Sequence, residues 1–289
     1  MSLLNVIILA VIQGLAELLP VSSSAHVIIA EKLMGLDPAS PPMTLLLVSL
    51  HTGTMFAVIA YFWRQWQNRY FQSAEGFKKS FGRLVLATIL TGIVGEICVK
   101  IIEKTLFRNQ PHAQIEDLFS HLELIAPALA AAGILILIAG IMEKRNRTGD
   151  LAETKETNIW RAAVVGMVQG LCLPFRGFSR SGSTISAAML AGVAKSEAET
   201  FSFALAVLLT PVVVGRETMR LIQAERITHT AQLASAVFPS LLGAAFAFIA
   251  GLLALKWLTR WLESGRWYLF GIYCLIASAA VTALYRVGF

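Results

Sequence analysis

Residues 11–26 read VIQGLAELLPVSSSAH, and residues 167–184 read MVQGLCLPFRGFSRSGST. In both stretches an apolar segment containing Gln-Gly-Leu runs into a proline and then into a cluster of hydroxyl-bearing residues. Proline ends or bends a helix, so residues 3–30 and 160–193 are not expected to cross a membrane as single helices. Broken backbone is tolerated at membrane depth only where protein or a watery cavity covers it. We therefore predict two re-entrant helical hairpins.

The chain as a whole has the composition of a membrane protein. Of its 289 residues, 56% are hydrophobic and 15% are charged, and the mean hydropathy is +0.67. Soluble domains carry about 25% charged residues. The sequence thus predicts an all-α, polytopic membrane protein that forms one integral membrane domain over residues 1–289. Its six transmembrane helices are expected near residues 43–63, 84–103, 124–142, 200–222, 234–257 and 267–286.

The two hairpins begin similar halves of the chain. Gln13 and Gln169 are 156 residues apart, and three predicted spans follow each hairpin. An odd number of spans per copy turns the second copy over in the membrane. We therefore predict an inverted repeat, with one copy at about residues 1–145 and the other at about residues 158–289. Repeats of this kind place their binding site where the two copies meet.

The basic residues indicate the orientation of the chain. The formal net charge is +6, but Lys and Arg occupy short loops between apolar runs, which argues against a nucleic acid partner. The loops at residues 64–83 and 143–161, and the loop with Arg260 and Arg266, lie on one side in the predicted topology. We expect that side to be cytoplasmic, with both termini and residues 104–123 outside. The six tryptophans lie at predicted span ends, as interfacial anchors do.

The first hairpin carries an acidic residue. Gln13 and Glu17 are four residues apart, so they share one face of a helix that Pro20 then ends or bends. A carboxylate in apolar surroundings is costly unless it is partnered, which makes Glu17 a functional candidate. The alternative is that Glu17 only pairs with an arginine and holds the two halves of the chain together.

Hydroxyl groups follow this acid. Ser22, Ser23 and Ser24 lie at the start of the next helix, where unpaired backbone N–H groups favour anions. Serines in this position also serve as helix caps, and for Ser22 or Ser24 alone that role is the simpler interpretation. As a set they indicate more, because His26 and Glu17 supply the base that a hydroxyl nucleophile needs.

The second hairpin has the residues of a phosphate-binding turn. Gly177 precedes a segment in which Ser179, Arg180, Ser181 and Thr184 open a helix. Backbone N–H groups, hydroxyl donors and a planar guanidinium in such a turn converge on phosphate oxygens. Arg180 is the residue whose presence packing explains least. Its structural alternative, an ion pair with Glu17, would also bring the two hairpins together.

Other polar residues have structural interpretations. His51 is expected to form hydrogen bonds between helices. Glu96 and Lys100 are spaced for an ion pair along one helix. Arg176 fits either the second hairpin or an interfacial position, and the sequence leaves both open.

The motifs of the two hairpins together resemble those of the undecaprenyl-diphosphate phosphatase family, the bacitracin-resistance membrane phosphatases. They are Gln-Gly-x-x-Glu-x-x-Pro-Val-Ser-Ser-x-x-His at residues 13–26 and Gly-Phe-Ser-Arg-Ser-Gly-x-Thr at residues 177–184. The resemblance implies hydrolysis of undecaprenyl diphosphate to undecaprenyl phosphate and inorganic phosphate, which recycles the lipid carrier for peptidoglycan synthesis. It also implies a bacterial inner-membrane protein whose site faces the periplasm.

The resemblance further implies roles for individual residues. Glu17 is similar to the family's acidic catalytic residue, Ser23 to its nucleophile, His26 to its acid/base partner and Arg180 to its phosphate clamp. The remaining substrate-binding positions that the motifs indicate are Gln13, Ser22, Gly177, Ser179, Ser181 and Thr184. The family's dependence on Mg²⁺ or Ca²⁺ implies a divalent cation, with Glu17 and Gln13 as expected ligands. Many members have Glu where this chain has Gln13, and Pro174 lies farther from the serine-arginine pair than is common in the family.

Several alternatives stay open at this point. The nucleophile is either Ser23 or an activated water. A lipid-phosphate transporter or flippase can use the same inverted-repeat site without hydrolysing its ligand. The histidine-dependent lipid phosphatases are disfavoured, because their Arg-Pro and His-x-x-x-Asp motifs do not occur in the chain. The expected partners are a polyprenyl diphosphate and membrane lipids, and a homodimer is one candidate for the oligomeric state.

Overall fold

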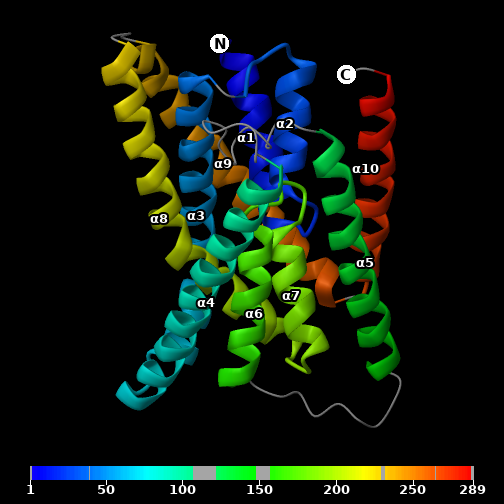
Figure 1. The fold of residues 1–289 in the computed structure, drawn as a ribbon. Helices are drawn as coiled ribbons and strands as arrows, with labels where there is room; N and C mark the ends of the chain where they lie inside the picture. Colours follow the sequence, from blue (N-terminus) through cyan, green and yellow to red (C-terminus); the bar gives the residue numbers. More distant parts are fainter. Residues whose placement is uncertain are drawn as a thin grey trace. The chain divides into compact units, whose positions relative to one another are not determined.

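The structure of the chain, a computed structural model, describes residues 2–38, 40–106, 122–147, 157–228, 232–263 and 265–287. These residues form ten helices and no strand (Figure 1), which confirms the all-α prediction. The helices are α1 (Leu3–Leu18), α2 (Ser23–Leu33), α3 (Pro41–Tyr70), α4 (Ala74–Leu106), α5 (Leu122–Arg147), α6 (Ile159–Cys172), α7 (Arg180–Leu190), α8 (Lys195–Thr228), α9 (Gln232–Glu263) and α10 (Tyr268–Arg286).

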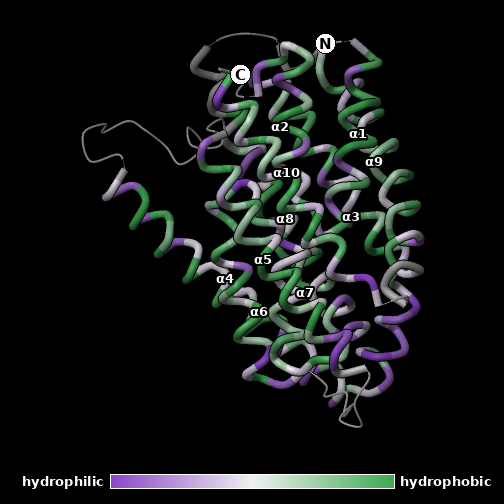
Figure 2. Tube along the Cα trace, turned by 90° about the vertical axis from the view of Figure 1, so that its right-hand side faces the viewer, coloured by the Kyte–Doolittle hydropathy of each residue, from purple (hydrophilic) through white to green (hydrophobic). Residues whose placement is uncertain are grey.

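Among the described residues, six helices are long and apolar enough to cross a membrane. They are α3, α4, α5, α8, α9 and α10, and they cover the six spans predicted from the sequence. Figure 2 shows hydrophobic residues along most of the length of these helices. The chain is therefore a multi-pass membrane protein, as predicted.

The loop expected at residues 64–83 is much shorter than predicted. Helix α3 continues to Tyr70, and α4 begins at Ala74. Lys and Arg are good helix formers, so charged residues beyond the apolar part of a span stay helical. Of the other expected loops, residues 107–121 and 148–156 lie outside the described part of the chain.

A pair of short helices occurs at each place where a hairpin was predicted. Helix α1 packs against α2, and α6 packs against α7. The side chain of Ser2 caps α1 by accepting a hydrogen bond from Asn5 N, and the side chain of Asn158 caps α6 in the same way through Arg161 N. Both caps lie 156 residues apart, the spacing of the two Gln-Gly-Leu segments. The re-entrant placement of these pairs in a bilayer and the repeat boundaries stay predictions.

The described residues divide into two compact units that interleave along the chain. Unit 1 consists of Met1–Leu19, Ser23–Arg64 and Ala206–Thr259, and unit 2 consists of Pro20–Ser22, Gln65–Leu205 and Arg260–Phe289.

Unit 1 is built around α1, α3 and α9. A cluster of buried apolar side chains from α1, α2, α3 and α9 forms its core, comprising Val6, Leu9, Ala10, Val27, Met43, Leu46, Leu50 and Ala247. The helices approach closely at small residues. A Cβ at Gly14 would lie 2.5 Å from Ala250 Cβ, and one at Gly53 would lie 2.9 Å from the backbone carbon of Ala244. Small residues allow this approach, which is the usual basis of helix packing in membranes.

Unit 2 contains two close helix pairs and the second hairpin. Helix α5 runs beside α10, and α4 runs beside α6 (Figure 1). Thr91 of α4 donates a hydrogen bond of 3.0 Å to the carbonyl of Gly166 in α6, and Ser278 of α10 donates one of 2.6 Å to the carbonyl of Ala126 in α5. Helix α7 packs against both α5 and α6.

Each unit combines the first hairpin helix of one predicted repeat with a span of the other. In unit 1, Gly14 of α1 packs on α9, where a Cβ would lie 2.8 Å from Ala247 O. In unit 2, Gly170 of α6 packs on α4, where a Cβ would lie 2.8 Å from Thr91 O. The two glycines are 156 residues apart, and α4 and α9 are each the second span after a hairpin. In both units, therefore, the glycine of a Gln-Gly-Leu segment packs on the second span of the other predicted repeat.

The prediction that the tryptophans are interfacial anchors is wrong for two of them. Trp267 is fully buried and donates a hydrogen bond of 3.0 Å from Nε1 to Ser186 Oγ. Trp66 is buried and donates to the carbonyl of Thr200. An indole N–H needs a partner when it is buried, and both find one inside unit 2. Trp63, Trp160 and Trp257 are exposed, as anchors are.

The contact between α6 and α4 generates a stability prediction. Gly166→Ala would place a Cβ 2.7 Å from Ala87 Cα, so the helices must move apart. Overpacking of this kind costs about 1–3 kcal/mol, and we expect a lower midpoint for thermal unfolding in detergent. The matched control is Gly92→Ala on α4, where a Cβ meets nothing within 4 Å. Equal midpoints for the two variants would contradict this packing.

Candidate active site

The acidic residue of the first hairpin is hydrogen-bonded to a serine of the same hairpin. Glu17 lies in the last turn of α1, and Ser23 is the first residue of α2. Ser23 donates a hydrogen bond of 2.5 Å from its Oγ to Glu17 Oε2. Both residues belong to unit 1. A short bond between a hydroxyl and a carboxylate is a strong, charge-assisted interaction, and it polarises the hydroxyl.

Gln13 completes this group from one turn earlier in α1. Its Nε2 donates a hydrogen bond of 3.2 Å to the same carboxylate oxygen, Glu17 Oε2. The side chain of Gln13 is fully buried, and its carbonyl oxygen Oε1 has no hydrogen-bond partner among the described residues. A buried acceptor of this kind needs an explanation, and a ligand or a cation at the site would provide one.

The imidazole of His51 also lies against this carboxylate. Its Nε2 is 3.8 Å from Glu17 Oε2, within ion-pair distance but beyond a direct hydrogen bond. Its Nδ1 is 2.8 Å from the carbonyl of Leu47, one turn earlier in α3. Because a carbonyl only accepts, Nδ1 carries a proton, and Nε2 is the nitrogen that faces Glu17. The sequence analysis gave His51 a structural role and missed this contact, since no local motif links residue 51 to residue 17.

The turn between α1 and α2 has an unusual backbone. Ser22 has a φ of 69°, the only positive φ of a residue other than glycine in the described part of the chain. A left-handed conformation costs a residue with a side chain about 1–2 kcal/mol. Ser22 is also buried and belongs, with Pro20, to unit 2. Strained backbone of this kind tends to occur at functional sites.

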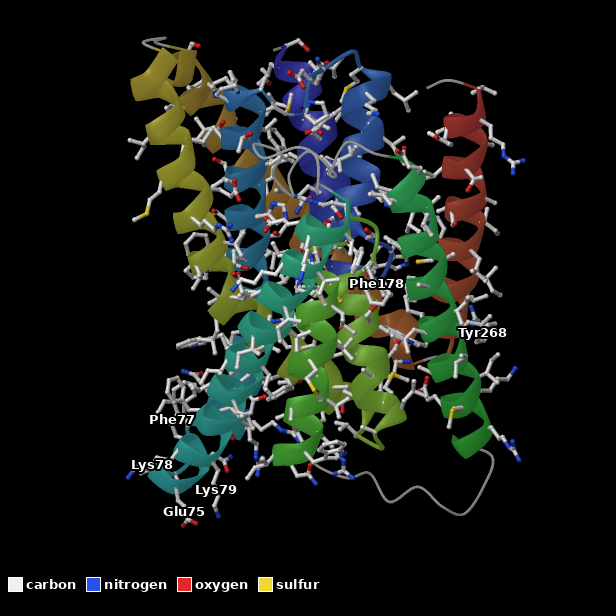
Figure 3. All side chains as sticks on the ribbon, viewed as in Figure 1. Glu75, Phe77, Lys78, Lys79, Phe178 and Tyr268 are labelled. Carbon is white, nitrogen blue, oxygen red and sulfur yellow. The ribbon has the colours of Figure 1, made fainter. Side chains whose placement is uncertain are left out.

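The second hairpin presents Arg180 at the start of a helix. Arg180 is the first residue of α7, and Ser179 caps the helix by accepting a hydrogen bond of 3.2 Å from Gly182 N at its Oγ. The connection from α6 includes Phe178, labelled in Figure 3. Gly177 has a φ of 102°, and a Cβ there would lie 2.6 Å from Ile125 O of α5. Only glycine fits this turn, which leads directly into the first turn of α7, where Arg180 lies.

Three predicted binding residues have structural partners in this helix. Ser179 acts as the cap, and Gly177 permits the turn, as described above. The Thr184 hydroxyl lies 2.7 Å from the carbonyl of Arg180 and 2.6 Å from Ser202 Oγ of α8, and it is fully buried. Ser181 is buried as well. These contacts hold the start of α7 in place around Arg180.

Within unit 2, the turn of the first hairpin packs on the first turn of α7. A Cβ at Gly182 would lie 3.1 Å from Pro20 Cβ, and Cys274 of α10 donates from Sγ to the carbonyl of Pro20 at 3.4 Å. Pro20, Ser22 and Arg180 are therefore parts of the same unit. Glu17 and Ser23 belong to unit 1, and His26 lies three residues beyond Ser23 with its side chain partly buried. The prediction that Glu17 and Arg180 face one ligand stays a prediction.

The residues around Glu17 are suited to a divalent cation that also binds phosphate. Mg²⁺ is commonly held by one or two carboxylates together with phosphate oxygens. Glu17 supplies one carboxylate, and the unpartnered Gln13 Oε1 is a carbonyl oxygen of the type that such cations accept. Among the described residues, no group of three or more His, Cys, Asp and Glu side chains is placed to hold a metal ion. The Glu17 carboxylate and Gln13 Oε1 are fewer ligands than such a cation takes, so phosphate oxygens would have to complete its coordination.

The ion pair predicted between Glu96 and Lys100 along one helix is present. Lys100 and Glu96 form an ion pair of 3.4 Å on α4, and both side chains are exposed. A pair of this kind contributes little to stability.

The chain is similar to known proteins over nearly its whole length. Residues 6–280 match the family described as bacitracin resistance protein BacA. The chain is 54% identical to undecaprenyl-diphosphatase 2 of Acinetobacter baylyi over 98% of both chains. It is 35% identical to undecaprenyl-diphosphatase 2 of Burkholderia orbicola over 96% of this chain and 95% of that one. Undecaprenyl-diphosphatase 1 of Burkholderia pseudomallei is 34% identical over similar shares.

The contact of His51 with Glu17 predicts a role in the chemistry of this site. Loss of a group that orients a functional carboxylate typically costs about 10–100-fold in activity. We expect His51→Asn to lower the turnover of the purified protein by that amount, whatever its substrate, with little change in thermal stability. Thr52→Val is the matched control, because within the described part of the chain the Thr52 hydroxyl bonds only to the carbonyl of Val48 in its own helix. Equal turnover in both variants would place His51 outside the site.

Proposed function

Because the chain belongs to the bacitracin resistance protein BacA family, we propose that it is an undecaprenyl-diphosphatase. It hydrolyses undecaprenyl diphosphate to undecaprenyl phosphate and inorganic phosphate, and so recycles the lipid carrier for cell-wall synthesis. The name of the relatives supports this activity, and three of them match nearly the whole chain. The membrane-spanning helices fit a lipid substrate, because the isoprenoid tail can lie among them while the diphosphate occupies a polar site.

The observation that carries the proposal is the hydrogen bond of 2.5 Å from Ser23 to Glu17. A hydroxyl is a weak nucleophile unless an adjacent base accepts its proton. Glu17 has the position of that base. Ser23 Oγ attacks the terminal phosphorus, its proton passes to Glu17, and the bond from this phosphorus to the bridging oxygen breaks. Undecaprenyl phosphate leaves, and water then attacks the phosphoserine and releases inorganic phosphate.

Arg180 and the start of α7 supply the phosphate-binding half of the proposal. A guanidinium and the positive end of a helix dipole stabilise the charge of a phosphoryl group during transfer. Within unit 2, Pro20 from the turn of the first hairpin packs near Gly182 in the first turn of α7.

Glu17 and Gln13 are the residues that would hold a divalent cation, Mg²⁺ or Ca²⁺. A bound cation neutralises the charge of the diphosphate and polarises its oxygens. Gln13 Nε2 donates to Glu17 Oε2, and His51 Nε2 lies 3.8 Å from the same oxygen. His26, one turn into α2, is the proposed acid/base partner for the leaving phosphate.

The distribution of Lys and Arg residues along the chain supports a proposal for its location and orientation. The chain is a multi-pass membrane protein, and we place it in the bacterial inner membrane with its active site open to the periplasm. The rule that cytoplasmic loops carry more Lys and Arg supports this orientation. Association into a homodimer stays an expectation.

A lipid-phosphate transporter is the less favoured alternative. Repeats with broken helices are common in transporters, but the relatives carry the name of a diphosphatase. Hydrolysis in detergent requires no second compartment, so it separates the two functions.

The purified protein in detergent is expected to release inorganic phosphate from a C55 diphosphate, and a chelator of divalent cations is expected to lower the rate. Loss of an acid/base or charge-stabilising residue typically costs about two to four powers of ten in rate. Glu17→Ala and Arg180→Ala should therefore lose nearly all activity while keeping their helical content. The exposed pair Glu96 and Lys100 provides the control, since Lys100→Ala should leave the rate unchanged. Normal turnover in Glu17→Ala or Arg180→Ala would refute the proposed site.

Ser23→Ala distinguishes the serine from water as the nucleophile. If Ser23 attacks phosphorus, the variant is inactive, and a phosphorylated Ser23 is detectable by mass spectrometry in acid-quenched wild-type protein. If Ser23 only orients an attacking water, the variant keeps partial activity and no phosphoserine forms. The second result would overturn the covalent step and leave Glu17 as the base for water.

A further inference from the structure

A pocket of about 180 Å³ lies in unit 2, and none of its lining residues belongs to the proposed active site. Its walls come from the end of α3, the first turns of α4 and α8, and the segment before α6. Helix α6 has 14 residues, which is about 21 Å of helix, and separates this pocket from the turn that precedes Arg180. A water occupies about 30 Å³ in the liquid, so the pocket has room for a group as large as phosphate.

The charged residues at this pocket are mostly basic. Arg69, Lys79 and Arg83 line it, and the only acidic lining residue is Glu197. Arg69 forms an ion pair with Glu197, and Lys79 forms one of 2.7 Å with the highly exposed Glu75. Among the described residues no ion pair involves Arg83. The pocket therefore keeps a positive charge that its described neighbours do not balance.

Two hydroxyl groups of the pocket are buried and have no hydrogen-bond partner in the described part of the chain. They are Tyr70 Oη and Thr157 Oγ1, and the two residues are 8% and 2% exposed. Buried hydroxyls without a partner are uncommon and costly. Both can donate a hydrogen bond to an anion that enters the pocket.

The backbone at this pocket also favours an anion. Gly76 lies in the first turn of α4, Glu197 lies in the first turn of α8, and Thr157 lies two residues before α6 begins. Three helix N-termini therefore meet at the pocket, and each presents partial positive charge. Combined with a guanidinium and hydroxyl donors, this is the chemistry that recognises a phosphate group.

An exposed aromatic surface adjoins the same elements. The rings of Phe71 and Phe77 are 5.2 Å apart, and those of Phe77 and Phe81 are 5.5 Å apart. All three rings are exposed, and Phe77 is labelled at this end of α4 in Figure 3. Because α4 begins a candidate span at Ala74, we expect this surface and the pocket near the level of the lipid headgroups.

We propose that this pocket is a second phosphate-binding site, distinct from the hydrolytic one, and that it holds the phosphate of an anionic lipid headgroup. Arg83 provides the charge, and the hydroxyls of Tyr70 and Thr157 donate hydrogen bonds to the phosphate oxygens. Basic pockets between transmembrane helices bind anionic headgroups in this manner. Free inorganic phosphate shares the same recognition chemistry, and the experiment below separates the two sources.

The test titrates the full-length protein in detergent with three probes by isothermal calorimetry. The probes are dioleoyl phosphatidylglycerol, dioleoyl phosphatidylcholine and inorganic phosphate. The variants are Arg83→Gln and Tyr70→Phe, and the control is Lys78→Gln, which removes an equal charge from a side chain that does not line the pocket and points away from Lys79 (Figure 3). Hydrogen bonds to charged groups contribute about 1.5–3 kcal/mol, so Arg83→Gln should weaken binding about tenfold or more.

The expected result is saturable binding of phosphatidylglycerol that Arg83→Gln and Tyr70→Phe weaken and Lys78→Gln does not. Both pocket variants should keep the wild-type rate of phosphate release, which shows that they are folded. Saturable binding of inorganic phosphate with the same variant pattern supports the site and identifies free phosphate as its ligand. Absence of saturable binding for every probe, or equal weakening by Lys78→Gln, would overturn the proposal.

Discussion

The constraint on which the rest of this protein depends is the need to satisfy broken, polar backbone in a chain that is otherwise apolar. Helix α1 stops before Pro20, and α6 stops before Pro174, so both leave backbone groups without helical partners. The chain meets this need with serine caps, a glycine turn and close packing of small residues. The same devices collect hydroxyls, an acid and a guanidinium at the two breaks. The polar side chains of the candidate site therefore lie where the helices end.

The two hairpins share a framework but have diverged in chemistry. Gln13 and Gln169 are both fully buried, and each donates from Nε2 to a partner, Glu17 in one case and Thr91 in the other. At the position of Glu17 the second hairpin has Leu173, which lies 156 residues later. The basic residue Arg180 occurs only in the second. One hairpin carries a carboxylate and the other carries a guanidinium. This combination suits a substrate that needs both proton transfer and neutralisation of its negative charge.

Interleaving of the units explains why packing residues recur at repeat spacing. Gly14 and Gly170 each allow the first helix of a hairpin to approach a span from the other half of the chain. Membrane helices gain little from hydrophobic burial against one another, so close contact between small residues has to supply the attraction. The glycines of the Gln-Gly-Leu segments thus have a packing role, while the neighbouring glutamines donate hydrogen bonds, Gln13 to Glu17 and Gln169 to Thr91.

The sequence alone determined the helical class, the six spans, the two helix breaks and the family of the chain, because these depend on apolar periodicity and on motifs within single segments. The roles of Glu17, Ser23 and Arg180 stay predictions. Tertiary structure alone decided three things. It brought His51 to Glu17 across 34 residues, it buried Trp66 and Trp267, which span-end position had assigned to the interface, and it built the basic pocket from four separate segments. Each depends on which helices become neighbours, and no local pattern of residues encodes that choice.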